Sequence, residues 1–160
     1  MTHLMKSVRE TVFVRAFTWL KIPLIAHLRP TVLELSNERC AIRFPLTRRS
    51  KNHLGAMYFG ALCVGADVAG GLMAMKLANQ HKPKIDFVFK DFHAEFLKRA
   101  HADVVLTCED GAIISDLVER AAAGNERVND TVTVIATAPD ASGDEPIGRF
   151  KLTISLKKRQ

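Results

Sequence analysis

One carboxylate stands alone in the most apolar part of the chain. Asp67 is the only charged residue in the segment 59–75. An ionised carboxylate in apolar surroundings is costly, and burial raises its pKa, so such groups are often found at functional sites. Asp67 is therefore a candidate catalytic residue. The alternative is equally open: Asp67 caps a neighbouring backbone group or pairs with a core His or Arg.

A polar loop and a helix start lie just before this carboxylate. Asn52 and Gly55 belong to a basic loop over 47–57, and an apolar helix is expected from about Tyr58 to Ala78. The first N–H groups of a helix lack partners, and the helix dipole is positive there, so this end favours a developing negative charge. The segment 52–67 is the candidate site.

Three neighbouring side chains have simpler interpretations than catalysis. His53 and Tyr58 are more often ordinary loop and core residues. Cys63 shares a helix face with Asp67, but it lacks a His nearby in sequence to activate it, so a small apolar core role is favoured. The six His show no metal-ligand spacing, and the sequence has no nucleophile elbow, P-loop or dinucleotide glycine pattern.

The composition is that of one ordinary soluble domain. Of 160 residues, 48% are hydrophobic and 25% are charged, which excludes a disordered chain. Three cysteines are too few for a disulfide scaffold and fit a reducing compartment, so we expect a cytoplasmic protein. The net charge of +6 suits either a nucleic-acid surface or a small anionic ligand. Because no nucleic-acid motif accompanies it, we expect no nucleic-acid partner.

The elements that must position Asp67 follow from hydrophobic periodicity. Residues 1–29 predict an amphipathic helical extension, with Val8, Val12, Ala16 and Leu20 on one face, ended by Arg29-Pro30. The segment 59–75 predicts a buried helix rather than a membrane span, because it is rich in Gly and Ala and holds Asp67. We therefore expect no integral membrane contact.

Alternating apolar residues predict strands on both sides of this helix. They lie over 31–36, 39–46, 85–97, 102–108, 128–138 and 147–156, with a bulge near Asp91 and a short helix over 111–124. The expected architecture is α+β: a curved antiparallel sheet wrapped around a long central apolar helix, as one domain over 30–160.

The candidate site resembles one family. Asn52, Gly55, Tyr58-Phe59-Gly60 and Asp67 reproduce the spacing of the hotdog-fold acyl-CoA thioesterase superfamily, in its phenylacetyl-CoA-thioesterase-like branch and related uncharacterised bacterial domains. That branch carries Asn, Gly three residues on, His-Gly-Gly, then a deep acidic residue. Segment 96–100 is similar to its strand-ending Phe-Leu-Arg-Pro-Ala, and the resemblance spans about 30–158. Tyr58 replaces the family His and Phe59 replaces the first Gly, but a backbone N–H survives both changes.

The resemblance implies a hotdog fold and a mechanism. Asp67 would act as general base on water or attack the thioester directly, the N–H of Phe59 or Gly60 would polarise the carbonyl, and Asn52 would orient water or thioester. His53, Gly55, Tyr58 and Cys63 would contact substrate. No metal and no cofactor are implied, since coenzyme A enters as part of the substrate.

Helix geometry adds a condition of its own. Residues 59 and 67 are separated by about 12 Å along a helix, at about 1.5 Å per residue. One thioester carbon cannot contact both groups of a single helix. The amide and Asp67 that act on one substrate should therefore come from two subunits, which predicts a homodimer or a dimer of dimers, in agreement with the resemblance.

The cations near the site have one further candidate role. Arg48, Arg49, Lys51, Lys98 and Arg99 could bind the phosphates of coenzyme A, although a solvated cationic face is an equal alternative. The leading hypothesis is a thioesterase acting on acyl-CoA or acyl-carrier protein. The alternative is a non-catalytic hotdog module that binds acyl-CoA, a fatty acyl group or a protein partner.

Overall fold

A computed structural model describes residues 2–82 and 84–159. The helices are α1 (Thr2–Lys21), α2 (Pro23–Leu28), α3 (Phe59–Ala78), α4 (Gly111–Ala123) and α5 (Pro139–Ser142). The strands are β1 (Thr31–Leu35), β2 (Cys40–Phe44), β3 (Ile85–Phe96), β4 (Val104–Cys108), β5 (Val128–Ala138) and β6 (Gly143–Lys158). Met1 and Gln160, the outermost residues of the expected extension (1–29) and domain (30–160), lie outside the described residues, and that division of the chain stays a prediction.

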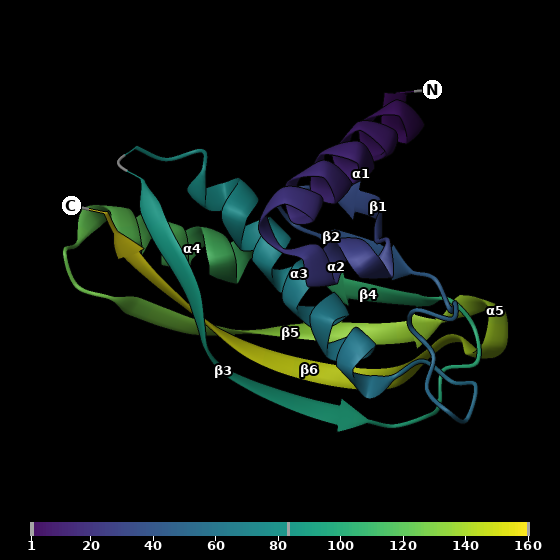
Figure 1. The fold of residues 1–160 in the computed structure, drawn as a ribbon. Coiled ribbons are helices and arrows are strands. Elements are labelled where there is room, and N and C mark those ends of the chain that lie inside the picture. Colours follow the sequence, from purple (N-terminus) through teal and green to yellow (C-terminus); the bar gives the residue numbers. More distant parts are fainter. Residues whose placement is uncertain (1, 83, 160) are drawn as a thin grey trace.

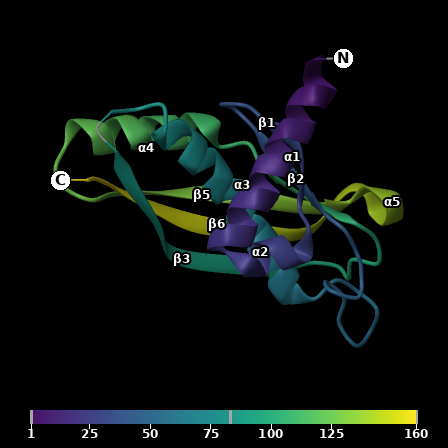
Figure 2. The same cartoon turned by 45° about the horizontal axis from the view of Figure 1, so that its top comes forward.

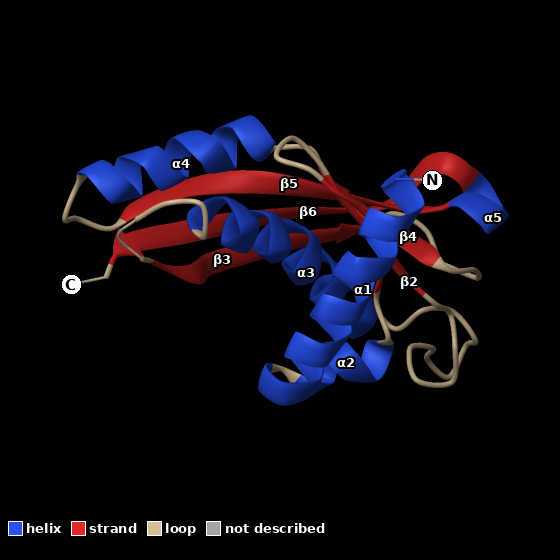
Figure 3. Cartoon of the chain, turned by 90° about the horizontal axis from the view of Figure 1, so that it is seen from above, coloured by secondary structure: helices blue, strands red, loops and turns tan. Residues whose placement is uncertain are grey.

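The strands form one antiparallel sheet in the order β1-β2-β4-β5-β6-β3. Figure 1 shows the sheet curving beneath α3, with α1, α2 and α4 on the same side as α3. Seen from that side, the four helices lie in front of the sheet (Figure 3). The predicted α+β hotdog architecture, a curved antiparallel sheet around a long apolar helix, is confirmed.

The bulge predicted near Asp91 sets the face of the edge strand β3. The register of β3 against β6 shifts between Phe89 and Asp91, so Phe89 pairs with Ile154 and Phe92 with Leu152. Directly opposed residues share a face of the sheet. Because Ile154 and Leu152 are fully buried on the helix side, the shift keeps the aromatic residues before and after it on that side.

Small residues let α3 sit close to the sheet. A Cβ at Gly65 would lie 2.5 Å from Leu106 Cδ1, while Ala66 and Ala69 are fully buried. In length and composition α3 could also cross a membrane, but 72% of its most apolar window is buried inside the protein. This is the environment of a core helix, as predicted.

The N-terminal segment differs from its prediction in two ways. The helix is interrupted at Ile22, and Pro23 occupies the first turn of α2, where its missing N–H costs nothing. The apolar face predicted for α1 is its outward face: Val8, Val12 and Leu20 are more than half exposed, whereas Thr11, Val14 and Thr18 are buried. Figure 2 shows α1 passing in front of α3 and leading into α2, with its N-terminal turns projecting beyond the sheet.

Gly111, at the start of α4, touches the turn between β1 and β2. A Cβ there would lie 2.0 Å from Asn37 O and 2.6 Å from Glu38 Cα, both backbone atoms. We expect Gly111→Ala to lower the free energy of unfolding by about 1–3 kcal/mol. Gly70→Ala is the matched control, because its Cβ would meet Val132 Cγ2 at an ordinary 3.6 Å. Urea unfolding of both variants measures this difference. Equal free energies of unfolding for the two variants would contradict the close contact between Gly111 and the turn.

Candidate functional site

The loop before α3 is closed by Asn52. Its side-chain Oδ1 accepts hydrogen bonds from the N–H groups of Leu54 (2.9 Å) and Ala56 (3.2 Å), and its own N–H donates to Ala56 O (2.8 Å). Gly55 has φ +76°, a left-handed conformation that favours glycine. The Asn-x-x-Gly pattern thus builds a tight turn, and the side-chain amide N–H₂ of Asn52 is the part that remains for a ligand.

The first amides of α3 divide into used and unused groups. The Tyr58 N–H donates to Ser50 O (2.7 Å), and the Ala61 N–H donates to Tyr58 O (2.9 Å). Within the described residues, the N–H groups of Phe59 and Gly60 have no acceptor. Two adjacent free donors therefore stand at the positive end of α3, the arrangement that stabilises a developing oxyanion.

Asp67 lies two turns further along the same helix and is surrounded by apolar groups. Burial raises the pKa of its carboxyl group. No hydrogen bond or ion pair to it occurs among the residues that the structure describes. A methyl group added to Gly71 would lie 3.5 Å from Asp67 Oδ1 and 3.4 Å from Phe87 Cζ, so the carboxylate and this ring are neighbours. The alternative that Asp67 pairs with a core His or Arg finds no partner in this part of the chain.

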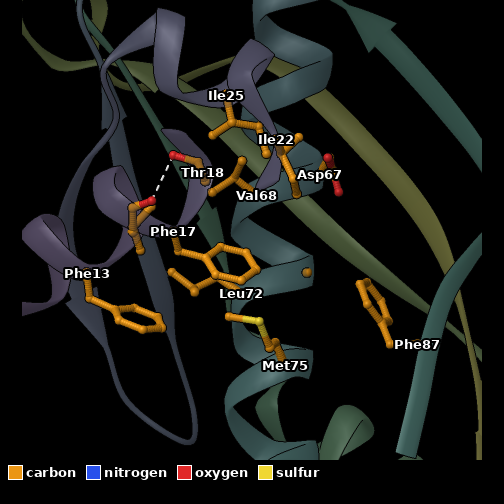
Figure 4. A pocket seen from close by; sticks show the side chains of 12 residues that line it. Phe13, Phe17, Thr18, Ile22, Ile25, Asp67, Val68, Leu72, Met75 and Phe87 are labelled. Carbon is orange, nitrogen blue, oxygen red and sulfur yellow. Dashed lines mark hydrogen bonds between the residues drawn. The ribbon is translucent and has the colours of Figure 1, made fainter. Parts of the chain in front are cut away.

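The carboxylate borders an apolar pocket of about 100 Å³ between α1, α2, α3 and β3. Figure 4 shows Asp67 on the β3 side of α3, with Phe87 across from it. Apart from Asp67 and Thr18, the lining is apolar: Phe13, Val14, Phe17, Ile22, Ile25, Val68, Gly71, Leu72, Met75 and Phe87. Ligand pockets of this kind combine an apolar wall with one or two placed polar groups.

Sequence reasoning missed this wall, because α1 and α2 supply half of it. Phe17 and Ile25 lie more than 40 residues before Asp67. Their approach to α3 depends on how the two helices pack and leaves no mark in the local sequence pattern. In the folded protein the rings of Phe13 and Phe17 stack on each other (centroids 6.0 Å apart) within this wall.

Exposed aromatic side chains surround the start of α3. Tyr58 contacts Phe59 (ring centroids 4.7 Å apart), and Phe59 contacts Phe96 of β3 edge to face (5.9 Å). Phe59 and Phe96 are about half exposed, at 56% and 47%. A methyl group at Gly60 would lie only 2.5 Å from Tyr58 Cε1, so the tyrosine ring covers the helix beside the free amides.

Two other predicted contact residues, His53 and Cys63, differ in where they lie. His53 is exposed in the loop. Cys63 is half-buried one turn before Asp67, and burial raises the pKa of its thiol, which disfavours the thiolate. Within residues 2–82 and 84–159, no three His, Cys, Asp or Glu side chains gather as metal ligands would.

The five candidate phosphate-binding cations are only partly brought together. A hydrogen bond from the Met57 N–H to Ala100 O (2.8 Å) joins the loop of Lys51 to the segment of Arg99. Lys98 Nζ pairs with Glu145 Oε2 (2.5 Å). Arg49 borders a hollow between α1 and α2 with Arg15 and Arg29. Arg48, Lys51 and Arg99 are exposed and form no ion pair with described residues.

The free amides at the start of α3 and the carboxylate of Asp67 are separated along the helix. Since α3 is one continuous helix, the free amides and Asp67 stay about 12 Å apart along its axis. They nevertheless share a face, because residues 59, 63 and 67 recur at the helical spacing of four. That face looks toward the exposed edge strand β3.

Comparison with known proteins gives a family and a fold. The sequence profile of a family described as "Domain of unknown function (DUF4442)" matches residues 10–156. A comparison with curated proteins finds no match.

Three solved structures illustrate the shared fold. A Chlorobaculum tepidum protein of unknown function superposes with a TM-score of 0.78 at 10% identity, over 96% of this chain and 97% of the other. A Pseudomonas aeruginosa protein described as a probable thioesterase gives 0.77 at 21% identity, over 93% and 96%. A thioesterase from Haemophilus influenzae gives 0.64 at 13% identity, over 84% and 82%.

Proposed function

We propose that this chain, which belongs to the DUF4442 family, is a hotdog-fold thioesterase that hydrolyses an acyl-CoA or acyl-carrier-protein thioester. The observation that carries the proposal is a desolvated, unpaired carboxylate beside an apolar pocket, on the helix whose first two amides are free. Thioesterases among the proteins of similar fold support it. The phenylacetyl-CoA-thioesterase-like branch remains our finer proposal, based on the spacing from Asn52 to Asp67.

The proposed mechanism gives each group one step. The amide of Phe59 or Gly60 donates to the thioester oxygen and stabilises the negative charge that develops there. Asp67 removes a proton from the attacking water, or itself attacks the carbonyl carbon. Its raised pKa brings the carboxylate closer to the value that suits a general base. The side-chain amide of Asn52 is left to orient water or thioester. When water attacks, expulsion of the thiolate of coenzyme A or of the carrier protein leaves the free acid, and the thiolate takes up the proton that Asp67 removed. When Asp67 attacks, expulsion of the thiolate leaves an anhydride between the acyl group and Asp67, which a water molecule then hydrolyses to the free acid.

We further propose that the complete site needs two copies of the chain, as a homodimer or a dimer of dimers. The two chemical groups are too far apart on α3 for one substrate carbon. β3 is an edge strand, and its Phe92 and Phe96 are 41% and 47% exposed on the helix side. Pairing two such edges would cover these rings and bring the α3 helices of two subunits together.

The proposed substrate orientation places the acyl group in the apolar pocket and the phosphates outside. Arg48, Arg49, Lys51 and Arg99 are the favoured candidates for the phosphates, because Lys98 is paired with Glu145. His53, Gly55, Tyr58 and Cys63 stay proposed contact residues. A cytoplasmic location, with no bound cofactor or metal and no nucleic-acid partner, also remains part of the proposal.

A panel of thioesters tests the proposed function. Short, medium, long and phenylacetyl-CoA substrates, with one acyl-carrier protein, would be offered to the wild type while free thiol is measured. We expect hydrolysis of at least one substrate. Glu119→Gln is the matched control, because it removes an exposed carboxylate of α4 away from the site and should keep the wild-type rate within about threefold. Absence of hydrolysis across the panel would contradict the proposal.

One observation favours a second candidate, a non-catalytic module that binds acyl-CoA, an acyl group or a protein partner. Tyr58 covers the helix start, where the resembling family carries a different residue. Tight binding of an acyl-CoA without turnover would select this candidate.

A further inference from the structure

Helix α1 is attached to the sheet by polar side chains. The Ser7 hydroxyl donates to Val32 O, and Thr11 Oγ1 accepts from the Val32 N–H (2.9 Å). One turn further along, Arg15 Nε donates to Pro30 O (2.8 Å) and Arg15 Nη2 to Thr31 Oγ1 (3.0 Å). Residues 7, 11 and 15 recur at the helical spacing of four, so one polar face of α1 satisfies the backbone of the edge strand β1.

This attachment turns the apolar side of α1 that lies opposite the buried Val14 away from the protein. Its outward residues are largely exposed: Met5 (68%), Val8 (57%), Val12 (62%), Trp19 (72%) and Leu20 (69%). Leu24 of α2 continues the surface at 63%. An exposed apolar stripe on a folded domain marks an interaction surface, because isolated domains rarely leave such stripes uncovered. We call residues 5, 8, 12, 19, 20 and 24 the outer stripe.

Cations surround the outer stripe. Five of them lie within residues 5–29 (Lys6, Arg9, Arg15, Lys21 and Arg29), against Glu10 as the only acid. Arg49 joins Arg15 and Arg29 beside Trp19 and Leu20, where a hollow opens between α1 and α2. An apolar helix face that carries an indole and is bordered by Lys and Arg suits the boundary between lipid headgroups and acyl chains.

We propose that the outer stripe of α1 docks on an anionic lipid bilayer, with the helix lying in the headgroup region rather than spanning it. Charge complementarity selects this occupant. In a twofold contact between two copies, the same patch meets itself, so Arg9 and Lys6 would approach the cations of the other copy. An anionic surface instead attracts every one of these groups. The proposal is independent of the thioesterase activity.

The chain carries its own reporter for this proposal. Trp19 is the only tryptophan and is 72% exposed on the outer stripe. We expect its fluorescence emission to shift to the blue when vesicles of equal parts phosphatidylcholine and phosphatidylglycerol are added. Vesicles of phosphatidylcholine alone should give little shift, and added salt should reverse the shift on anionic vesicles. Co-sedimentation with the same vesicles gives the affinity.

The double variant Val12→Ser/Leu20→Ser removes two outward side chains without touching the buried face of α1. It should lower affinity for the anionic vesicles by about tenfold or more, because two aliphatic groups no longer enter the lipid. Ile113→Ser is the control, as an exposed aliphatic residue on α4. Circular dichroism verifies that each variant is folded.

Two results would overturn the proposal. One is an unchanged Trp19 emission with anionic vesicles. The other is a double variant that sediments with them as the wild type does. If sedimentation equilibrium shows that the double variant loses an oligomeric state, while the wild type ignores vesicles, the occupant is a second copy of the chain.

Discussion

Asp67→Asn is expected to lower kcat/KM for the preferred thioester by about 10²–10⁴-fold, the usual contribution of a positioned general base. The amide keeps the shape of the carboxylate but neither accepts a proton at neutral pH nor attacks a carbonyl carbon. The measurement is steady-state hydrolysis by the two proteins at matched concentrations. A variant that retains the wild-type rate would remove Asp67 from the mechanism.

Although Asp67→Asn should lower activity, it should raise the free energy of unfolding at neutral pH. Burial raises the pKa of Asp67 in the folded state above 3.8, its ordinary value, so the fold favours the protonated form. The stabilising contribution of that form is fully present below pH 3.8 and is lost as the pH rises through the folded-state pKa. At pH 7 the ionised carboxylate therefore costs stability, and Asp67→Asn should unfold at a higher urea concentration than the wild type. The difference should shrink as the pH falls.

Asp110→Ala provides the contrast. The Asp110 carboxylate accepts a hydrogen bond from the Thr133 N–H (2.6 Å), so its loss should lower the free energy of unfolding by about 0.5–2 kcal/mol. Catalysis should be unaffected by this change at the residue that precedes α4. Loss of both activity and stability in Asp67→Asn would instead indicate a structural role for Asp67.

Phe59→Pro is expected to lower kcat by about 10²–10³-fold, the effect of removing one oxyanion donor. Proline deletes the free N–H at the first position of α3, where a helix tolerates it best. Tyr58 before it already has φ −65° and ψ 135°, the extended conformation that a residue preceding proline adopts. Phe59→Ala is the matched control: it loses the same ring but keeps the N–H, and it should retain most of the rate.

The two variants together test whether a site is shared between subunits. Mixed after unfolding and refolding, Asp67→Asn and Phe59→Pro should recover about a quarter of wild-type activity, because half of random dimers are mixed and each has one intact site. Equal rates for Phe59→Pro and Phe59→Ala would remove the Phe59 amide from the mechanism. If the mixture stays inactive although both variants exchange subunits, the two groups do not act across an interface.

Local patterns in the sequence were enough to predict the fold. The alternation in 128–138 and 147–156 indicates which side chains face the helix, and that pattern is what an antiparallel sheet requires. The offset between Ile85-Phe87-Phe89 and Phe92-Ala94-Phe96 indicates the bulge at the same place where the register shifts. Both signals depend on neighbours a few residues apart.

The outward orientation of α1 could not be predicted in this way. The periodicity of Val8, Val12 and Leu20 predicts them as the inner face. The opposite orientation depends on the hydrogen bonds that join Ser7 and Thr11 to the backbone of Val32, more than 20 residues away. The candidate site likewise has parts that local sequence predicts and parts that it does not. Asp67 and the start of α3 could be found locally, whereas Ser50 as the acceptor for the Tyr58 amide depends on how the loop closes.

The hydrogen bonds between α1 and β1 also limit how far this sheet can grow. An open sheet has two edges, and each exposed edge is a template on which further strands can add. Here Ser7 and Thr11 bind the outer backbone groups of Val32 in β1, and Arg15 binds Pro30 O just before the strand, which leaves β3 as the more accessible edge. In the proposed pairing of two β3 edges, strand addition would therefore end at two copies, because α1 covers Val32 of β1 at both outer margins of the combined sheet. We expect α1 to block the addition of further strands there and so to oppose fibrous self-association.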